Sequence, residues 1–417
     1  MNINWKKIVI LIGFLLTIIM LGYLLYYFLL KPSASQIPVG NQNINATGGL
    51  PNANTNVNIP INSTTGLLPQ GTDNQQNINQ TTGQPASAAS IANGGKTITN
   101  ALTTSPTSGL TLANNKNGLL YYEKNSGLFY RIDQSGQITP LSSQIFYDVS
   151  QVTWSPNKNE AILEYPDGSN ILYNFATNKQ TTLPAHWKDF NFSPSGSQIV
   201  FKSIGDSVDN RWLAVAKADG SSAVKIESLG DKDKTVYPSW SPNNQMVAMF
   251  SEDRNVDQQT LYFVGLNKEN FKSLTIQGRD FRNVWSPNGD RLLYSVYNSQ
   301  NDGKPNLFIA TTQADTIGQV NKSLQISTWA DKCTFADNNI VYCAVPQRLD
   351  EGAGIFPNDL DNSPTDLYKI DLNSGTKNLI ATPDKNQNAQ NLVVDANQQF
   401  LYFTSKTDGN IYQIRLK

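Results

Sequence analysis

Histidine, the side chain most often used for proton transfer near neutral pH, occurs only once in the 417 residues, at His186. Paired-histidine metal sites are therefore excluded, and a Ser-His-Asp relay has a single candidate base. The chain also lacks the GxSxG elbow, the phosphate-binding loop and the dinucleotide-binding glycine motif. The sequence predicts no catalytic residue, no resident metal and no cofactor, so the chemistry to look for is non-covalent binding.

Acidic residues gather in one stretch near the end of the chain. Carboxylate oxygens are the ligands that calcium prefers, but the spacing of these residues fits no EF-hand loop, and we predict a solvated acidic loop. The residues are Asp350, Glu351, Asp359, Asp361 and Asp366.

Cys333 and Cys343 flank one hairpin of the repeat described below. Outside the cytoplasm a disulfide between them is possible. In the simplest register Cys333 shares a face with Phe335 while Cys343 points the other way, so a β-bulge would be needed to pair them. The sequence leaves the bonded and the free state open.

Composition changes sharply along the chain, although the whole is 16% charged with a formal net charge of −1. Ile8–Leu30 contains no charged residue. A helix rises about 1.5 Å per residue, so a helix of this length can cross the hydrocarbon core of a membrane. Lys6 and Lys7 precede it, so the positive-inside rule predicts a cytoplasmic tail at 1–7 and an extracytoplasmic remainder. A signal peptide cleaved near Ser33–Ser35 is the alternative.

Residues 31–95 are rich in Asn, Gln, Thr, Gly and Pro and nearly lack aromatic residues. Such a segment cannot bury enough apolar area to offset its ordering entropy, and we predict a disordered linker. Residues 96–417 hold nearly all the aromatic residues and are the predicted folded domain. No basic excess points to nucleic acid as a partner.

A bulky apolar residue followed by Ser-Pro and a turn residue recurs along the folded domain, as in "WSPNG" from Trp285. Apolar residues stand seven and nine positions later, which is the period of a strand with one buried face. Ser-Pro-Asn-Gly favours a tight turn, so each copy predicts a β-hairpin. The sixth copy has a loop two residues shorter, which puts Ile340 and Tyr342 at the inward positions. The anchors are Leu112, Trp154, Phe192, Trp240, Trp285, Phe335 and Val394.

Each unit continues with a third strand, such as "LFYRI" from Leu128, and most have a weaker fourth. Four short strands in a repeat of roughly 45 residues indicate a blade of a β-propeller. We count seven blades, with six as the alternative. The last unit ends after its third strand, so the segment from Lys96 is predicted to supply the missing outer strand and close the ring.

The copies "WSPNG" and "FSPSG", followed by alternating apolar residues and a Leu-Tyr-x-Ile strand, resemble the TolB-like propeller repeat, a relative of the WD repeat. The resemblance covers about three quarters of the chain and implies a β-propeller. This chain differs from the TolB protein in its predicted helical anchor, its lack of a preceding α/β domain and its seven units instead of six. No partner is carried over from the resemblance.

Connections from an outer strand to the next innermost strand surround the mouth of a propeller channel. Trp187 and Trp329 lie in such connections, and the loops between second and third strands, long in units three to six, share that face. A binding surface is one interpretation of these loops, and tolerated insertions are the other. The candidate binding residues are His186, Trp187, Arg279, Arg282, Trp329 and Asp331.

The sequence as a whole predicts a single-pass membrane protein with an extracytoplasmic propeller on a polar tether. The favoured function is a non-catalytic binding or scaffold module for a protein or glycan of the cell envelope. The alternative is an enzyme or ligand-sensing receptor with its site at the mouth of the central channel.

Overall fold

A computed structural model describes residues 20–21, 87–114, 118–360 and 362–417. Contacts divide the chain into two units, Met1–Asn79 and Gln80–Lys417. All the sheets and core clusters described below lie in the second unit, which therefore has its own hydrophobic core and can fold on its own. Met20 and Leu21 are the only described residues of the predicted membrane helix. No helix in the described ranges is long and apolar enough to cross a bilayer.

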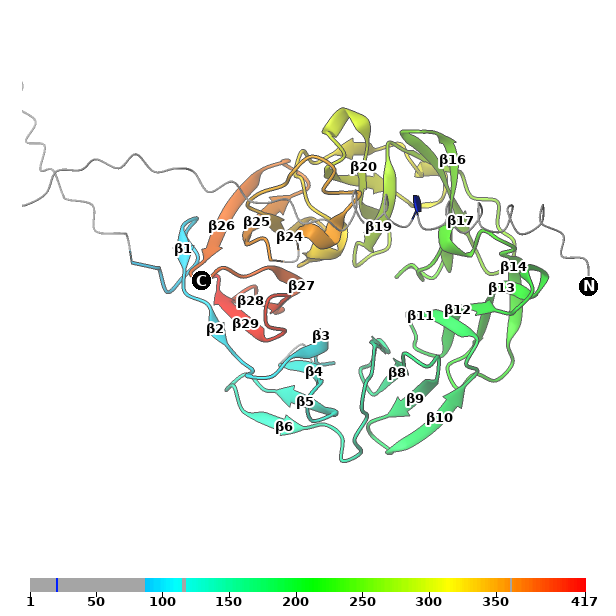
Figure 1. The fold of residues 1–417 in the computed structure, drawn as a ribbon, viewed down its shortest axis with the longest axis horizontal. Coiled ribbons are helices and arrows are strands. Elements are labelled where there is room, and N and C mark those ends of the chain that lie inside the picture. Colours follow the sequence, from blue (N-terminus) through cyan, green and yellow to red (C-terminus); the bar gives the residue numbers. More distant parts are fainter. Residues whose placement is uncertain (1–19, 22–86, 115–117, 361) are drawn as a thin grey trace, which may run out of the picture. The chain divides into compact units, whose positions relative to one another are not determined.

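The second unit is an all-β propeller of seven blades, arranged in chain order around a ring (Figure 1). In each of blades one to six the chain runs from the innermost strand outward, and all these neighbouring strands are antiparallel. This result confirms seven blades rather than six.

The strands of the first three blades follow the repeat closely. Blade one contains β3 (Thr107–Leu112), β4 (Leu119–Glu123), β5 (Leu128–Ile132) and β6 (Ile138–Pro140). Blade two contains β7 (Gln151–Trp154), β8 (Glu160–Glu164), β9 (Asn170–Asn174) and β10 (Lys179–Leu183). Blade three contains β11 (Trp187–Phe192), β12 (Gln198–Ile204), β13 (Arg211–Lys217) and β14 (Val224–Ser228).

Blades four, five and six have the same arrangement. Blade four contains β15 (Val236–Pro238), β16 (Ala248–Asn255), β17 (Gln258–Val264) and β18 (Leu274–Ile276). Blade five contains β19 (Arg279–Trp285), β20 (Arg291–Tyr297), β21 (Pro305–Thr311) and β22 (Asn321–Ser323). Blade six contains β23 (Cys333–Phe335), β24 (Ile340–Pro346), β25 (Thr365–Asp371) and β26 (Lys377–Pro383).

Short 3₁₀ helices occupy the connections. They are η2 (Val208–Asn210), η3 (Asp233–Thr235), η4 (Ser299–Asn301), η5 (Ala314–Thr316), η6 (Ala330–Lys332) and η7 (Pro357–Leu360).

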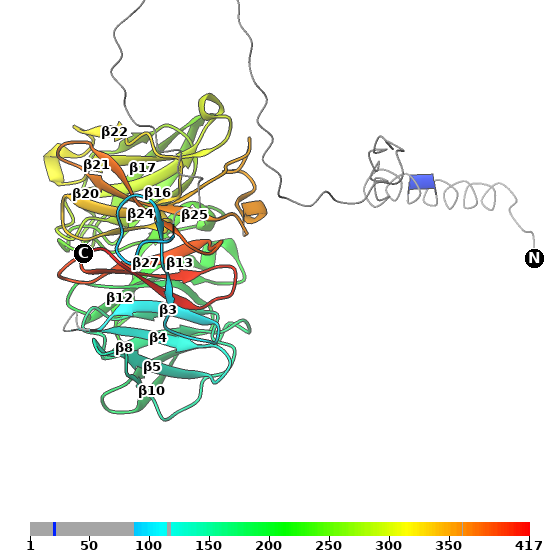
Figure 2. The same cartoon turned by 90° about the vertical axis from the view of Figure 1, so that its left-hand side faces the viewer.

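The two ends of the propeller unit close the ring together. Blade seven contains β27 (Ala389–Val394), β28 (Phe400–Ser405) and β29 (Ile411–Arg415), and β2 (Asn100–Ala101) pairs antiparallel with β29 as its outer strand. The predicted closure is thus confirmed. In addition, β1 (Lys96–Thr97) pairs parallel with β26 and gives blade six a fifth strand. Figure 2 shows this cyan segment crossing from the orange blade to the red one.

We call residues 89–107 the strap, because their hydrogen bonds join blades six and seven. The amide of Ala92 donates to the carbonyl of Arg415 and the amide of Gly94 to that of Ile380. Further along, the amide and hydroxyl of Thr99 both donate to Asp384 Oδ1, at 2.9 and 2.7 Å. Hydrogen bonding to the blades therefore begins before the expected domain boundary at Lys96.

Each Ser-Pro turn is held by its serine. The hydroxyls of Ser155, Ser193, Ser241 and Ser286 are buried and accept from the backbone amide five residues later, at 2.9–3.2 Å. The fourth turn residue is left-handed in all four copies, which is where glycine and asparagine are favoured. A buried hydroxyl that closes the hairpin explains why serine recurs there.

The sixth hairpin has a different register from the predicted one. The amide of Ala336 donates to the carbonyl of Ile340, four residues later, where the other turns span five. The turn is therefore shorter by one residue and not by two. Phe335 pairs with Val341, so Val341 and Cys343 occupy the places that we predicted for Ile340 and Tyr342.

Candidate functional site

The long loops of blades four, five and six form one connected surface. The predicted loop of blade four is largely strand, because β16 and β17 extend to a turn at Val256–Asp257. In blade five the amide and hydroxyl of Ser299 donate to the two carboxylate oxygens of Asp257, at 3.0 and 2.5 Å. The two neighbouring blades are thus joined at their tips.

The blade six loop is joined to blade five through its backbone. The amide of Gly352 donates to the carbonyl of Asp302, and that of Gly354 donates to Gly303, both at 2.8 Å. An added Cβ at Gly354 would lie 2.6 Å from Tyr297 Cβ, so only glycine permits this approach. Insertions that are merely tolerated would not need such bonds between loops of successive blades.

We call the outer part of these loops the rim surface. It surrounds a cavity of about 570 Å³ lined by residues of all three blades, among them Val256, Arg279, Tyr297 and Ile355. Val256 is 79% exposed and Ile355 is 50% exposed, and the adjacent Phe356 is 62% exposed. These apolar side chains are therefore exposed on loops that hydrogen bonds hold in place.

Arg279 is the one predicted site residue that lies at the rim surface. Its guanidinium forms an ion pair with Asp253 and donates to the carbonyls of Asn255 and Val256. These bonds hold the turn of blade four, so Arg279 supports the rim surface.

Arg282, Trp329 and Asp331 come together in a second cluster near the channel. Arg282 forms ion pairs with Asp331 at 2.9 Å and Asp280 at 3.0 Å, and its guanidinium lies 5.6 Å from the ring centre of Trp329. Coulombic attraction to both carboxylates raises the pKa of Arg282 above its usual value, against the opposing effect of burial. Residues around this cluster line a cavity of about 140 Å³.

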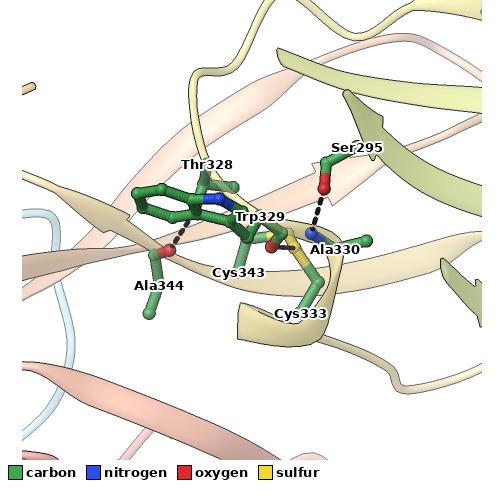
Figure 3. Close-up of a disulfide and its surroundings, with 7 residues drawn as sticks. All are labelled: Ser295, Thr328, Trp329, Ala330, Cys333, Cys343 and Ala344. Atoms are coloured by element: carbon green, nitrogen blue, oxygen red, sulfur yellow. Dashed lines mark hydrogen bonds between the residues drawn. A yellow bond between two sulfur atoms is a disulfide. The ribbon is translucent and has the colours of Figure 1, made fainter. Parts of the chain in front are cut away.

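The segment that carries Trp329 is fixed by the disulfide (Figure 3). Cys333 and Cys343 are bonded and stand directly opposite each other in the ladder, with their Cα atoms 4.1 Å apart. The expected bulge is therefore unnecessary, because the corrected register turns Cys343 toward Cys333. The hydroxyl of Thr328 donates to the carbonyl of Ala344 at 2.6 Å. Only 3% of Trp329 is exposed, which makes it a packing residue.

His186 and Trp187 lie apart from both clusters, where the connection from blade two enters β11, of which Trp187 is the first residue. Trp187 is 6% exposed and stacks on Phe201 with ring centres 3.7 Å apart, so it belongs to the core. The ring of His186 is exposed beside it. The sequence indicated the position of Trp187 in a connection but could not show that its side chain turns inward.

The central channel contains a cavity of about 650 Å³ lined by innermost strands of five blades. Its wall is polar, with Thr111, Gln151, Asp189 and Asn191 among its residues, and the half-buried Lys158 reaches it from the turn of blade two. Desolvation by burial lowers the pKa of Lys158 to about 8.

Glu164 is a buried acid next to this channel. Burial, aided by the nearby carboxylate of Asp189, raises the pKa of Glu164 to about 7, although the amide of Asp189 acts in the opposite direction. Asp189 itself forms an ion pair with Lys202 at 2.7 Å. In the ranges that the structure covers, no group of three or more His, Cys, Asp or Glu residues could hold a metal ion.

The sequence reasoning missed Val256, Ile355 and Phe356. Their signal was present, since each interrupts a polar loop that was recognised as long. Glu164 was also missed, because it stands within a strand and only the fold places it beside Asp189.

Neither a protein-family model nor a curated protein matches this chain in sequence. Solved structures share its fold. An oligogalacturonate lyase in complex with manganese has a TM-score of 0.50 and 14% identity, over 76% of this chain and 93% of that one. The β-propeller domain of Myceliophteria thermophila Cps50 (Swd1) has a TM-score of 0.52 and 10% identity, over 76% of this chain and 100% of that one. At these identities the likeness concerns the fold alone, and the TolB-like resemblance stays a prediction.

Proposed function

We propose that this protein is a membrane-tethered propeller that binds a polypeptide partner through its rim surface and performs no chemistry itself. The observation that carries the proposal is the set of hydrogen bonds between the loops of blades four, five and six. These bonds hold the loops whose exposed residues Val256 and Ile355 line one cavity, next to the exposed Phe356. Preformed loops lose little conformational freedom on binding, and less ordering entropy then opposes association.

The chemistry of the rim surface favours a polypeptide over a glycan. Aliphatic and aromatic side chains that have been removed from water form the core of protein interfaces, with polar groups around them. Glu351 and Asp359 expose carboxylates on the loop that carries Phe356. The partner expected here therefore presents an apolar side chain flanked by basic residues.

The tether is the second part of the proposal. Ile8–Leu30 would anchor the chain in a membrane with residues 1–7 in the cytoplasm, and residues 31–95 would let the propeller search its surroundings outside. A flexible linker of this length has a root-mean-square span of roughly 45 Å. This arrangement suits a scaffold of the cell envelope, on the periplasmic or cell-surface side.

Photo-crosslinking in the native membrane tests the rim surface. A photoreactive amino acid replaces Phe356 in the full-length protein, and a matched variant carries it at Val224, which is 59% exposed on the outer strand of blade three. We expect a discrete crosslinked protein from position 356 only, and its loss when Val256→Ser and Ile355→Ser are added. Equal products from both positions, or none from position 356, would overturn the proposal.

A second candidate function is that of an enzyme or ligand-sensing receptor with its site at the mouth of the channel. The polar cavity favours it, as do Lys158 and Glu164, two nearby groups whose pKa values are displaced. A thermal-shift screen of small hydroxylated and anionic compounds tests it. Saturable stabilisation that Lys158→Ala removes would support the channel site, and stabilisation that persists in Lys158→Ala would refute its use of this amine.

A further inference from the structure

A cavity of about 380 Å³ lies between blades three and four, away from the rim surface and the channel. We call it the inter-blade hollow. Blade three supplies Leu213, the connection between the blades supplies Leu229, and blade four supplies Val236, Phe250 and Phe263. Its size falls in the range of small-molecule sites, which is about 300–1,000 Å³.

The side chains of this gap leave the hollow unfilled. Sheets arranged radially diverge away from the axis, so the outer part of each gap needs bulky residues. The cluster between blades three and four contains two aromatic residues, Trp240 and Phe250, and is otherwise aliphatic. Protein interiors rarely leave voids larger than a water molecule, and an apolar wall without contacts loses dispersion energy. An apolar occupant would restore those contacts.

The mouth of the hollow carries charges of both signs. Lys232 lies over the ring of Phe250, with Nζ 5.4 Å from its centre, and forms an ion pair with Glu252 at 3.2 Å. Lys268 is an exposed residue of the lining. Glu227 is an exposed carboxylate. Glu269 also lies at the mouth, and its oxygens accept from the amide and side chain of Asn267, at 2.8 and 3.0 Å.

The geometry points to a ligand site for a single-chain amphiphile with a zwitterionic head group. The apolar chain occupies the inter-blade hollow, where its burial supplies the main driving force. The head group lies at the mouth, where Lys268 faces its anionic part and Glu227 its cationic part. A head group that carried only a positive or only a negative charge would be repelled by the one of these two residues that has the same sign. The site is independent of the rim surface, so the result of its test does not bear on the proposed function.

Calorimetric titration of residues 80–417 with decylphosphocholine, kept below its micelle-forming concentration, tests this inference. We expect saturable one-to-one binding with a negative heat-capacity change, which marks burial of apolar surface. Decyl sulfate and decyltrimethylammonium have the same chain with one charge each, and we expect both to bind at least threefold more weakly. The absence of saturable binding would overturn the inference, and equal affinity for all three probes would overturn its head-group part.

Two variants block the hollow from different sides. Val264→Trp fills it from the wall and should weaken binding at least tenfold while the melting temperature is kept or raised. Ser228→Trp covers it from an exposed position at the lip, so it preserves the core if Val264→Trp does not fold. Lys225→Ala, on the same strand but outside the lining, is the control and should change affinity less than twofold. Undiminished binding by a folded blocking variant would refute the site.

Discussion

The same repeat builds the contact between blades one and two and the contact between blades three and four, but the two contacts differ in how completely side chains fill them. Between blades one and two, Phe129 contacts Phe146, Trp154 and Phe175 with ring centres 5.0–5.9 Å apart, all edge to face. Between blades three and four, aliphatic residues predominate and a hollow remains. One contact is filled with protein, and the other leaves room for a ligand.

The loops also differ between these two sides of the ring. Blades one and two have short loops between their second and third strands, at 124–127 and 165–169, whereas the corresponding loops of blades four, five and six reach one another. The repeat thus separates two tasks: tightly packed blades hold the ring, and elaborated blades present surfaces. This division predicts that mutations will affect stability on one side and binding on the other.

Deletion of residues 89–104 should have the largest effect, because it removes the strap on which both sides depend. Blades six and seven would lose their paired outer strands and expose sheet edges. We expect the melting temperature of residues 80–417 to fall by roughly 10 °C or more, the equivalent of several kcal/mol for a domain of this size. An unchanged melting curve would show that the ring closes without the strap.

Substitution of an aromatic residue in each gap tests the packing comparison directly. Phe129→Ala should reduce the free energy of unfolding by about 3–5 kcal/mol, since it opens a cavity in a filled cluster. Phe250→Ala, beside a hollow that already exists, should cost less than half as much. Chemical denaturation of both variants measures the difference, and equal costs would refute the claim that the two gaps are packed differently.

Removal of the disulfide tests how far the elaborated side depends on its covalent link. The Cys333→Ala/Cys343→Ala double variant releases a closed loop with a sequence separation of 10, which should cost about 2–3 kcal/mol. Denaturation with and without a reductant checks this. Reduction should lower the stability of the wild type to that of the double variant. If the double variant is instead as stable as the oxidised wild type, the segment of Trp329 is held by its hydrogen-bonded neighbours alone.

The pH dependence of stability tests whether Glu164, on the tightly packed side of the ring, is buried. Its carboxyl ionises near 4.5 in the unfolded chain and at about 7 in the folded one, so between these values the unfolded state holds fewer protons. Stability should therefore fall as pH rises from about 4.5 to 7 and then level off, by up to roughly 3 kcal/mol. Glu164→Gln should remove this fall, whereas Glu351→Gln, on an exposed loop, should retain it. Identical pH profiles for wild type and Glu164→Gln would contradict the assignment.

Much of the fold could be predicted because the repeat is local. The Ser-Pro turn and the alternating apolar residues lie within a dozen positions. Six of the seven anchors end an innermost strand, and Trp240 follows β15 by two residues. The outer strand of blade seven was predictable from a count, since the last unit lacked a strand and the first segment had no blade, but the pairing of β1 with blade six was not predicted. The register of the sixth hairpin was not, because its length depends on a turn in which Asp337 accepts from the amides of Asn339 and Ile340.

The candidate site was predicted only in outline. Loop lengths indicated which sector is elaborated, but four of the six predicted residues serve as supports: Trp187 and Trp329 are buried, and Arg279 and Arg282 are held by carboxylates. Trp and Arg are frequent at interfaces and also frequent in packed connections, so residue type could not separate the two uses.

The sequence by itself determined the blade, favoured seven copies over six and indicated which segment supplies the outer strand of the last one, because hairpin turns and strand faces are set by neighbouring residues. The tertiary structure alone decided which loops touch, which gap is filled and which acid is buried. Those properties depend on side chains from different blades meeting across space, as Asp257 meets Ser299 and Glu164 meets Asp189. No local pattern specifies such a meeting.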